Sequence, residues 1–375
     1  PRKLIVVIMF PLLVVAAEFL GQVVFRMWGT AQSFSRVQTF WPPLIQIAAI
    51  TGQAGVTYLV CLTNAFLAGL LVLRKEDKDF SYGAVFFGVI MGLSAVYSIA
   101  SFYVDKPKEF IKVAALGWGE SGPVGSWEQR LKRIDWLIGE NEVDYRLIVY
   151  PEAALKIYFG EMDYFKYKLA EISRKHNIYQ FAGFFDEHRE YNGIMSVDPE
   201  GNTRELYYKT HLIKFIEDYN AGKGDVGSVD VDGVTVGAMI CQDDNFQDIA
   251  RRNRADGARV IVVPTNDWRQ VKDYHAENML YRAVENRVVI VRAASQGISR
   301  IIDPRGVVAA ERDPFFMGIG EGGESILTVK VRLPRRGSVY SLVGNVFVYV
   351  CMAALAIGCI MGLMGVRKRK DSVEG

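Results

Sequence analysis

Long uncharged stretches lie near both ends of the chain, whereas the apolar runs between them are short. A helix needs about 20 apolar residues to cross a bilayer, and four stretches reach that length. They are Leu4–Phe25, Gly55–Leu73, Tyr82–Tyr103 and Tyr340–Val366. The residues before the second stretch include Pro42 and Pro43, and proline disfavours a continuous helix. We therefore predict an interfacial segment there, followed by the second span.

The middle of the chain alternates short runs rich in Val and Ile with amphipathic helical patterns. The short runs predict strands at Phe110–Leu116, Leu147–Tyr150, Gln180–Phe185, Thr235–Cys241, Val260–Pro264, Val288–Ala293 and Gly297–Ile302. The amphipathic patterns predict helices at Trp127–Gly139, Phe165–His176, Asp243–Asp256 and Tyr274–Asn286. Strands that alternate with helices indicate an α/β domain with covered sheets. We therefore divide the chain into transmembrane helices at 1–104, a soluble domain at 105–335, and a last span with a basic tail at 336–375.

Composition and charge narrow the class of protein. Half of the 375 residues are hydrophobic (50%), and the formal net charge is +2. Such a balance offers no electrostatic footprint for nucleic acid. The four cysteines and four histidines show no spacing typical of a disulfide framework or a metal site. We expect a membrane protein without a metal or other cofactor.

Clusters of basic residues flank the apolar stretches and predict their orientation. Arg2 and Lys3 precede the first stretch, the loop 74–78 separates the second from the third, and the tail 367–370 follows the fourth. Lysine and arginine prefer cytoplasmic loops. One alternating topology places all three clusters inside the cell and the soluble domain outside.

Three polar side chains lie at the ends of predicted strands. Glu152 follows a strand and a proline, Lys209 lies among aromatic residues and leucine, and Cys241 ends an apolar run. Each of them has an ordinary structural explanation when taken singly. Glu152 fits a solvated turn, Lys209 fits a side chain that buries its aliphatic part and keeps its ammonium in water, and Cys241 fits a small core residue. Taken together, they offer a thiol nucleophile, a base and a cation, which is the equipment for acyl transfer through cysteine.

In the order Glu–Lys–Cys, the three motifs resemble the nitrilase (carbon–nitrogen hydrolase) superfamily, and the resemblance covers nearly the whole soluble domain. Further matches are Pro264-Thr-Asn-Asp-Trp268, Arg282-Ala-Val-Glu285-Asn-Arg287 and Gly297-Ile-Ser-Arg-Ile-Ile-Asp303. The resemblance implies an αββα sandwich, here carried on a transmembrane α-helical bundle. It also implies that Glu152, Lys209 and Cys241 are the catalytic residues.

The apolar stretches narrow the resemblance to the apolipoprotein N-acyltransferase family, on the matches Glu18-Phe-Leu, Ile45–Gly52 and Asn64-Ala. This resemblance implies a multi-pass protein of the bacterial inner membrane, with its catalytic domain on the periplasmic side. It implies a phospholipid acyl donor, phosphatidylethanolamine, and a diacylated lipoprotein as acceptor. Four spans are fewer than that family usually has, so we expect its first spans to be absent from this sequence.

The same resemblance assigns a role to each residue. Cys241 would attack the sn-1 ester of the lipid and carry the acyl chain as a thioester, which the α-amine of the lipoprotein then attacks. Glu152 would be the general base, and Lys209 would stabilise the oxyanion. Supporting residues would be Glu217, which orients Lys209 or the amine, Asp243 beside the nucleophile, and Trp127 near the substrate entrance.

Three departures from the family pattern surround the predicted site. Gln242-Asp243 replaces the usual Tyr-Glu, Lys214–Glu217 departs from Pro-Phe-Gly-Glu, and Leu116-Gly-Trp-Gly replaces Gln-Gly-Asn at the end of the first strand. Two alternatives therefore remain beside the acyltransferase. One is a membrane-anchored nitrilase-type amidase that uses water as acceptor. The other is an inactive relative that binds lipid or lipoprotein.

Overall fold

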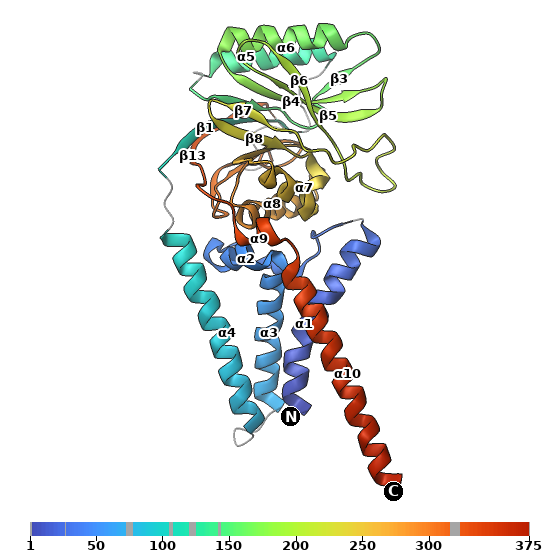
Figure 1. Cartoon of the computed structure of the whole chain (residues 1–375). Coiled ribbons are helices and arrows are strands. Elements are labelled where there is room, and N and C mark those ends of the chain that lie inside the picture. Colours follow the sequence, from blue (N-terminus) through green and yellow to red (C-terminus); the bar gives the residue numbers. More distant parts are fainter. Residues whose placement is uncertain are drawn as a thin grey trace. The chain divides into compact units, whose positions relative to one another are not determined.

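The chain forms two compact units (Figure 1). The structure is a computed structural model, which describes residues 2–26, 28–72, 78–104, 108–119, 125–141, 144–315 and 323–374. The membrane-helix unit joins Pro1–Asp105 to Leu342–Gly375, and the α/β unit is Lys106–Ser341.

The membrane-helix unit contains four long helices: α1 (Arg2–Phe25), α3 (Gln53–Val72), α4 (Lys78–Tyr103) and α10 (Val346–Glu374). Each includes a segment long and apolar enough to cross a membrane. The interruption predicted before the second span is confirmed, because three short helices precede α3: η1 (Phe34–Gln38), η2 (Pro42–Ile47) and α2 (Ala48–Thr51). Pro42 and Pro43 open η2, where a proline fits the first turn of a helix.

Packing inside this unit is modest. Helices α1 and α10 share a small buried cluster of Leu12, Val15, Val348 and Cys351. Many large apolar side chains stay exposed, including Leu71 with 89% of its surface accessible. Exposed apolar helix faces suit a hydrocarbon solvent, because the helix already satisfies its own backbone groups there.

The last predicted span begins later than the sequence indicated. Residues Val339–Val343 form a separate short helix, α9, and α10 starts only at Val346. Gly344 between them has a φ of 62°, which other residues adopt reluctantly. The predicted orientation of the spans stays a prediction, since Arg74 and Lys75 lie outside the described residues, as do the side chains of the other two basic clusters.

The α/β unit contains two mixed sheets. The first has the strand order β13-β1-β2-β4-β5-β6, with β3 also paired to β4. Its strands are β1 (Phe110–Gly117), β2 (Leu147–Val149), β3 (Leu155–Ile157), β4 (Tyr179–Asp186), β5 (Tyr191–Val197), β6 (Thr203–Tyr208) and β13 (Ser325–Arg332). The second has the order β12-β11-β10-β9-β8-β7. Its strands are β7 (Val229–Val231), β8 (Val234–Ala238), β9 (Val260–Asn266), β10 (Val289–Ser295), β11 (Ser299–Ile302) and β12 (Val308–Arg312).

The two sheets pack face to face between two pairs of helices (Figure 1). Helices α5 (Trp127–Glu140) and α6 (Met162–His176) cover the first sheet, and α7 (Gln247–Ala255) and α8 (Lys272–Asn286) cover the second. Central strands such as β2, β9 and β10 are buried on both faces, which explains their continuous Val and Ile runs. The predicted αββα sandwich is confirmed.

The chain around Cys241 differs from the prediction. Strand β8 ends at Ala238, and Cys241 instead begins a short 3₁₀ helix, η3 (Cys241–Asn245). Helix α7 correspondingly begins at Gln247 rather than at Asp243. The apolar run continues to Cys241 because Met239 and Ile240 are completely buried, and burial alone does not distinguish a strand from the turn that follows it.

Candidate active site

The predicted site residues follow strands of both sheets. Glu152 comes three residues after β2, Lys209 directly after β6, and Cys241 three residues after β8. Strands β2 and β4 are parallel, as are β8 and β9, so their carboxyl ends lie at common edges, where α/β proteins place their ligands. The amide of Glu152 donates to the carbonyl of Thr265 on β9 at 3.4 Å. This bond joins the two sheets at the site.

The carboxylate of Glu152 is buried and accepts three hydrogen bonds. Oε1 accepts from Lys209 Nζ at 2.8 Å and from Asn192 Nδ2 at 2.7 Å, and Oε2 accepts from the backbone amide of Asn266 at 2.8 Å. The turn that carries Glu152 packs tightly on β4, because a Cβ at Gly183 would lie 2.0 Å from the carbonyl oxygen of Pro151. A glycine at this position therefore lets the turn approach the sheet.

Lys209 is almost completely buried and lies between two carboxylates. Besides Glu152, its Nζ donates to Glu217 Oε1 at 2.6 Å. Burial opposes the charge of this ammonium, but the negative charges of Glu152 and Glu217 outweigh burial and raise the pKa of Lys209 well above its usual value. Lys209 is therefore a permanent cation. Glu217 is itself fixed by the amide of Ile213, which donates to Oε2 at 2.8 Å.

Cys241 is 3% exposed and has a positive φ of 44°. That backbone conformation costs a non-glycine residue on the order of 1–3 kcal/mol and is concentrated at functional sites. Burial, followed by the charge of Glu152, raises the pKa of the thiol well above its usual value, and Lys209 acts in the opposite direction. The thiol is thus protonated at neutral pH and lies in the electrostatic field of the Glu152–Lys209 pair.

Asp243 is completely buried and joins the lysine segment to the cysteine turn. Its Oδ1 accepts from the amide and from Nδ1 of His211, at 2.8 and 2.9 Å. Its Oδ2 accepts from the hydroxyl of Tyr207 at 2.9 Å and from the amide of Ile240 at 3.1 Å. One carboxylate therefore holds both the residues around Lys209 and the residue before Cys241. A supporting role for Asp243 in the reaction stays a prediction.

Trp127 is not a partner of these groups. It opens helix α5, where its Nε1 donates to Glu161 at 2.9 Å and its ring contacts Tyr164 and Phe165. Its buried side chain belongs to the core between the helices and the first sheet. A role at the substrate entrance stays a prediction.

Two asparagines also contact the predicted site residues. Asn192 donates to Glu152 and to the hydroxyl of Tyr219 at 3.1 Å, and its carbonyl accepts from the amide of Lys209 at 2.9 Å. Asn266 donates its amide to Glu152, while its carbonyl accepts from Cys241 Sγ at 3.9 Å. Asn266 lies within the matched run Pro264–Trp268, whereas Asn192 lies in β5, a strand that the sequence did not predict.

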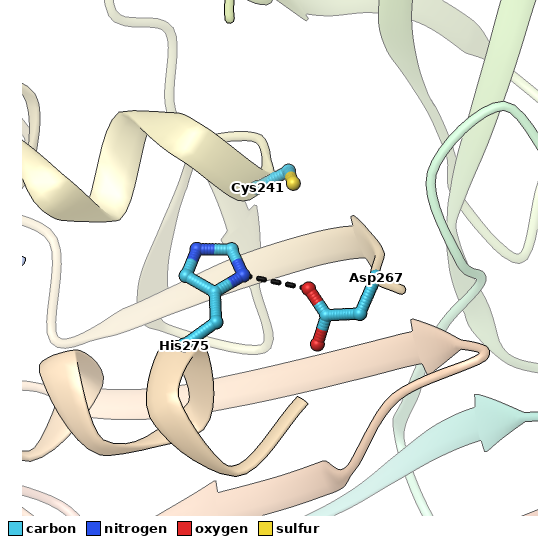
Figure 2. A group of neighbouring side chains, drawn as sticks. All are labelled: Cys241, Asp267 and His275. Atoms are coloured by element: carbon cyan, nitrogen blue, oxygen red, sulfur yellow. Dashed lines mark hydrogen bonds and ion pairs between the residues drawn. The ribbon is translucent and has the colours of Figure 1, made fainter. Parts of the chain in front are cut away.

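A second group of buried charges lies next to Cys241 (Figure 2). The donor atoms of Cys241, Asp267 and His275 all lie within 4.8 Å of one another. His275 Nδ1 is 2.7 Å from Asp267 Oδ1 and its Nε2 is 3.1 Å from Asp244 Oδ1, while Arg292 donates to Asp267 Oδ2 at 2.6 Å. A metal ligand needs a free lone pair on the imidazole. Both ring nitrogens here face carboxylates, so the group suits an imidazolium ion pair and not a metal.

Comparisons with known proteins identify the family of the α/β unit. The family model described as carbon-nitrogen hydrolase matches residues 112–339. An apolipoprotein N-acyltransferase of Geobacter metallireducens is 27% identical, over 95% of this chain and 74% of that protein. A 2-oxoglutaramate amidase of Bacillus subtilis is 29% identical, over 38% of this chain and 61% of the amidase.

Among solved structures, a carbon-nitrogen hydrolase from Helicobacter pylori matches with a TM-score of 0.50 and 15% identity. The match covers 59% of this chain and 89% of the hydrolase. At this identity it supports the fold alone. The resemblance predicted from the ordered Glu, Lys and Cys motifs is confirmed: this chain belongs to the carbon-nitrogen hydrolase family.

Proposed function

We propose that this protein is a membrane-bound acyltransferase. It would move a fatty acyl chain from a phospholipid to the N-terminal amine of a diacylglyceryl-cysteine lipoprotein, through a thioester on Cys241. The observation that carries the proposal is the buried Glu152–Lys209 ion pair beside the Cys241 thiol. The similarity to lipoprotein acyltransferases along 95% of the chain and the four apolar helices favour a lipid as acyl donor.

In the first half-reaction, Glu152 takes the thiol proton while Cys241 Sγ attacks the carbonyl carbon of the sn-1 ester. The two events must be coupled, because the resting thiol has a raised pKa and a free thiolate would be sparse. The ammonium of Lys209 stabilises the oxyanion as it forms. The C–O bond of the ester then breaks, and Glu152 passes its proton to the departing alkoxide oxygen. The lysophospholipid leaves as an alcohol, and Glu152 is ionised again.

In the second half-reaction, the lipoprotein amine attacks the thioester carbonyl. Glu152 accepts the proton that the amine loses, and Lys209 again faces the oxyanion. The C–S bond breaks, the sulfur regains a proton, and an amide is formed. Glu217, bonded to Lys209, keeps the ammonium directed to the site while Glu152 changes its protonation state.

The surface beside the site suits an acyl substrate. The segment between Lys209 and Glu217 exposes Phe215 and Ile216, with 96% and 58% of their surfaces accessible, and Trp268 is 44% exposed. Large apolar side chains exposed next to one another typically mark a binding surface. We assign them to contact with the acyl chain.

We further propose that the chain lies in the bacterial inner membrane with its α/β unit on the periplasmic side. The three basic clusters in the sequence support this orientation. A membrane-impermeant label should modify a cysteine introduced at exposed Glu190 in intact spheroplasts. Modification only after lysis would contradict the orientation.

A transfer assay tests the function. The purified protein is incubated with phosphatidylethanolamine labelled in its sn-1 chain and with a diacylated lipopeptide. We expect labelled triacylated peptide, and its complete loss in Cys241→Ala. Cys359→Ala is the matched control, because Cys359 is exposed on α10, and this variant should transfer normally.

The same assay separates the alternatives. A membrane-anchored amidase or hydrolase, favoured by Gln242-Asp243 and by the similarity to 2-oxoglutaramate amidase, would release labelled fatty acid and leave the peptide unchanged. A relative that only binds lipid or lipoprotein would give neither product. Either result would contradict acyl transfer to a lipoprotein.

A further inference from the structure

Cys241 faces a second cation besides Lys209. His275 projects from α8, and Figure 2 shows its imidazole close to both the thiol and the carboxylate of Asp267. His275, Asp267, Asp244 and Arg292 are all at least nine-tenths buried. Nothing in the two proposed half-reactions uses this group, although it shares the cysteine with them.

The contacts of His275 keep it charged. Asp267 and Asp244 each contact one ring nitrogen, and a carboxylate on both sides favours a proton on both nitrogens. The guanidinium of Arg292 also lies 3.2 Å from Nδ1. Burial opposes the charge, but these two carboxylates outweigh burial and raise the pKa of His275 to about 9. Arg292 binds the other oxygen of Asp267, so that two cations and two carboxylates balance one another.

The same group fixes the backbone that touches the reacting atoms. Asp267 directly follows Asn266, whose amide binds Glu152 and whose carbonyl faces Cys241 Sγ. The amide of Asp267 donates to the carbonyl of Ser295 at 3.0 Å. The ion pair between His275 and Asp267 thus anchors the residue that links the proposed base to the proposed nucleophile.

Charge next to Cys241 is otherwise unfavourable for a thiolate. Besides burial, the charges of Glu152, Asp267 and Glu217 raise the pKa of the Cys241 thiol, and the charge of Lys209 lowers it. Within a few ångströms, an additional cation favours the anionic form of a thiol. His275 supplies that cation from the side of the second sheet.

We propose that His275, held between Asp267 and Asp244, is a positioning residue that favours the anionic sulfur of Cys241 during acyl transfer and anchors Asn266 between Cys241 and Glu152. The proposal rests on Cys241 being the nucleophile. It assigns this role to an imidazolium that does not accept or donate the proton transferred in the reaction.

The test follows alkylation of Cys241 by iodoacetamide, which needs no lipid substrate and is therefore independent of whether acyl transfer occurs. The rate at Cys241 is read by peptide mass mapping of the full-length protein in detergent, as a function of pH. In His275→Gln the midpoint, the pH at which the alkylation rate reaches half its maximum, should rise by about one unit. Alkylation near pH 7 should then be about tenfold slower. His275→Lys, which restores a cation, should return the midpoint toward that of the unchanged protein.

His176→Gln is the matched control. His176 is also shielded from solvent and pairs with a carboxylate, Asp135 at 2.7 Å, but it lies on α6. Its variant should leave the midpoint unchanged. An unchanged midpoint in folded His275→Gln, or no return in His275→Lys, would overturn the proposal, because a purely structural role does not depend on the charge.

A second measurement needs no variant that might unfold. The sequence contains four histidines, so ¹³C-labelled histidine gives a simple NMR spectrum of the unchanged protein. The His275 signal should report an imidazolium at pH 7.5 that loses its proton near pH 9. A neutral imidazole at pH 7.5 would overturn the proposal whatever the variants do.

Discussion

Two acidic side chains, one in each unit, are surrounded by hydrogen-bond donors of different kinds. Glu18 lies within α1 and accepts from the hydroxyls of Ser33 and Thr57, both at 3.0 Å, and from the amide of Phe34 at 2.8 Å. Glu152 in the α/β unit accepts from an amide and a side-chain amide as well, but also from the ammonium of Lys209.

Under the proposed function, the difference separates a structural carboxylate, Glu18, from a catalytic one, Glu152. The donors of Glu18 are neutral: Thr57 lies in α3, Ser33 caps η1, and Phe34 is the first residue of η1. The carboxylate therefore connects α1 with α3 and with the start of η1. These contacts direct the Glu18 carboxylate toward neighbouring segments of its own unit, as expected of a polar residue within a span. Glu152 has a cation and a thiol as neighbours, which is what proton transfer to and from a nucleophile requires.

The largest effect should come from removing the charge of Glu152. We expect Glu152→Gln to lower the rate of acyl-adduct formation by about 10³-fold, since general base catalysis typically contributes 10²–10⁴-fold. Adduct is measured by the label retained on the protein after denaturation. Normal adduct formation in this variant would exclude Glu152 as the base and remove the contrast with Glu18.

Next in size is the loss of Asp243, which touches both halves of the site. Asp243→Asn replaces an oxygen that accepts several N–H and O–H groups, so the segments carrying Lys209 and Cys241 should shift, and we expect about 10²-fold slower transfer. Asp303→Asn is the control, because Asp303 is also a buried turn carboxylate and binds the amides of Arg305 and Val307. Equal losses of activity in the two variants would mean that Asp243 only stabilises the fold.

The buried charges beside Cys241 predict how stability depends on pH. The pKa of His275 is raised from 6.5 to about 9, so its stabilising contribution is complete below pH 6.5 and is lost as the pH rises through about 9. Burial opposes the charge of Asp267, but Arg292 and His275 lower its pKa, so its contribution is present above about pH 4 and lost below. The melting temperature of the α/β unit within the full chain should therefore fall at acidic and at alkaline pH. In His275→Gln the fall at alkaline pH should be smaller. An unaltered alkaline fall would contradict the ion-pair assignment.

The smallest effect should come from Glu18. In Glu18→Gln the amide oxygen can still accept from the two hydroxyls, while the NH₂ group opposes the amide of Phe34. We expect a loss of about 1 kcal/mol in unfolding free energy and transfer within about threefold of the unchanged protein. Thermal unfolding and the transfer assay measure both. A loss as large as that of Glu152→Gln would show that Glu18 takes part in substrate binding or chemistry.

Much of the fold follows from local pattern. The buried strands β1, β2, β4, β9 and β10 were predictable because both of their faces are covered, which selects continuous apolar runs. Strands such as β5, β6 and β13 were missed, since polar residues interrupt their apolar runs. The positive φ of Cys241 and the break at Gly344 depend on single residues that a periodic pattern does not register.

The site was predictable in part. The order and local context of Glu152, Lys209 and Cys241 identified the superfamily, and the structure brings Glu152 and Lys209 into contact. Asn266 lies within one of the matched motifs, but its contacts, like those of Asn192 and His275, could not be predicted because they join strands and helices far apart in the sequence. Asp243 stands where the family usually has a glutamate. Its shorter side chain accepts hydrogen bonds from Tyr207, His211 and Ile240.

The most direct test of the central claim is the mass of the Cys241 peptide after incubation with a phospholipid of defined sn-1 chain and no acceptor. A thioester predicts a mass increase equal to one acyl group on this peptide, reversed by neutral hydroxylamine. In Cys241→Ser any adduct should be an ester that resists the same treatment. An unmodified Cys241 peptide, or a labile acyl group found instead on Cys61, Cys351 or Cys359, would contradict the account.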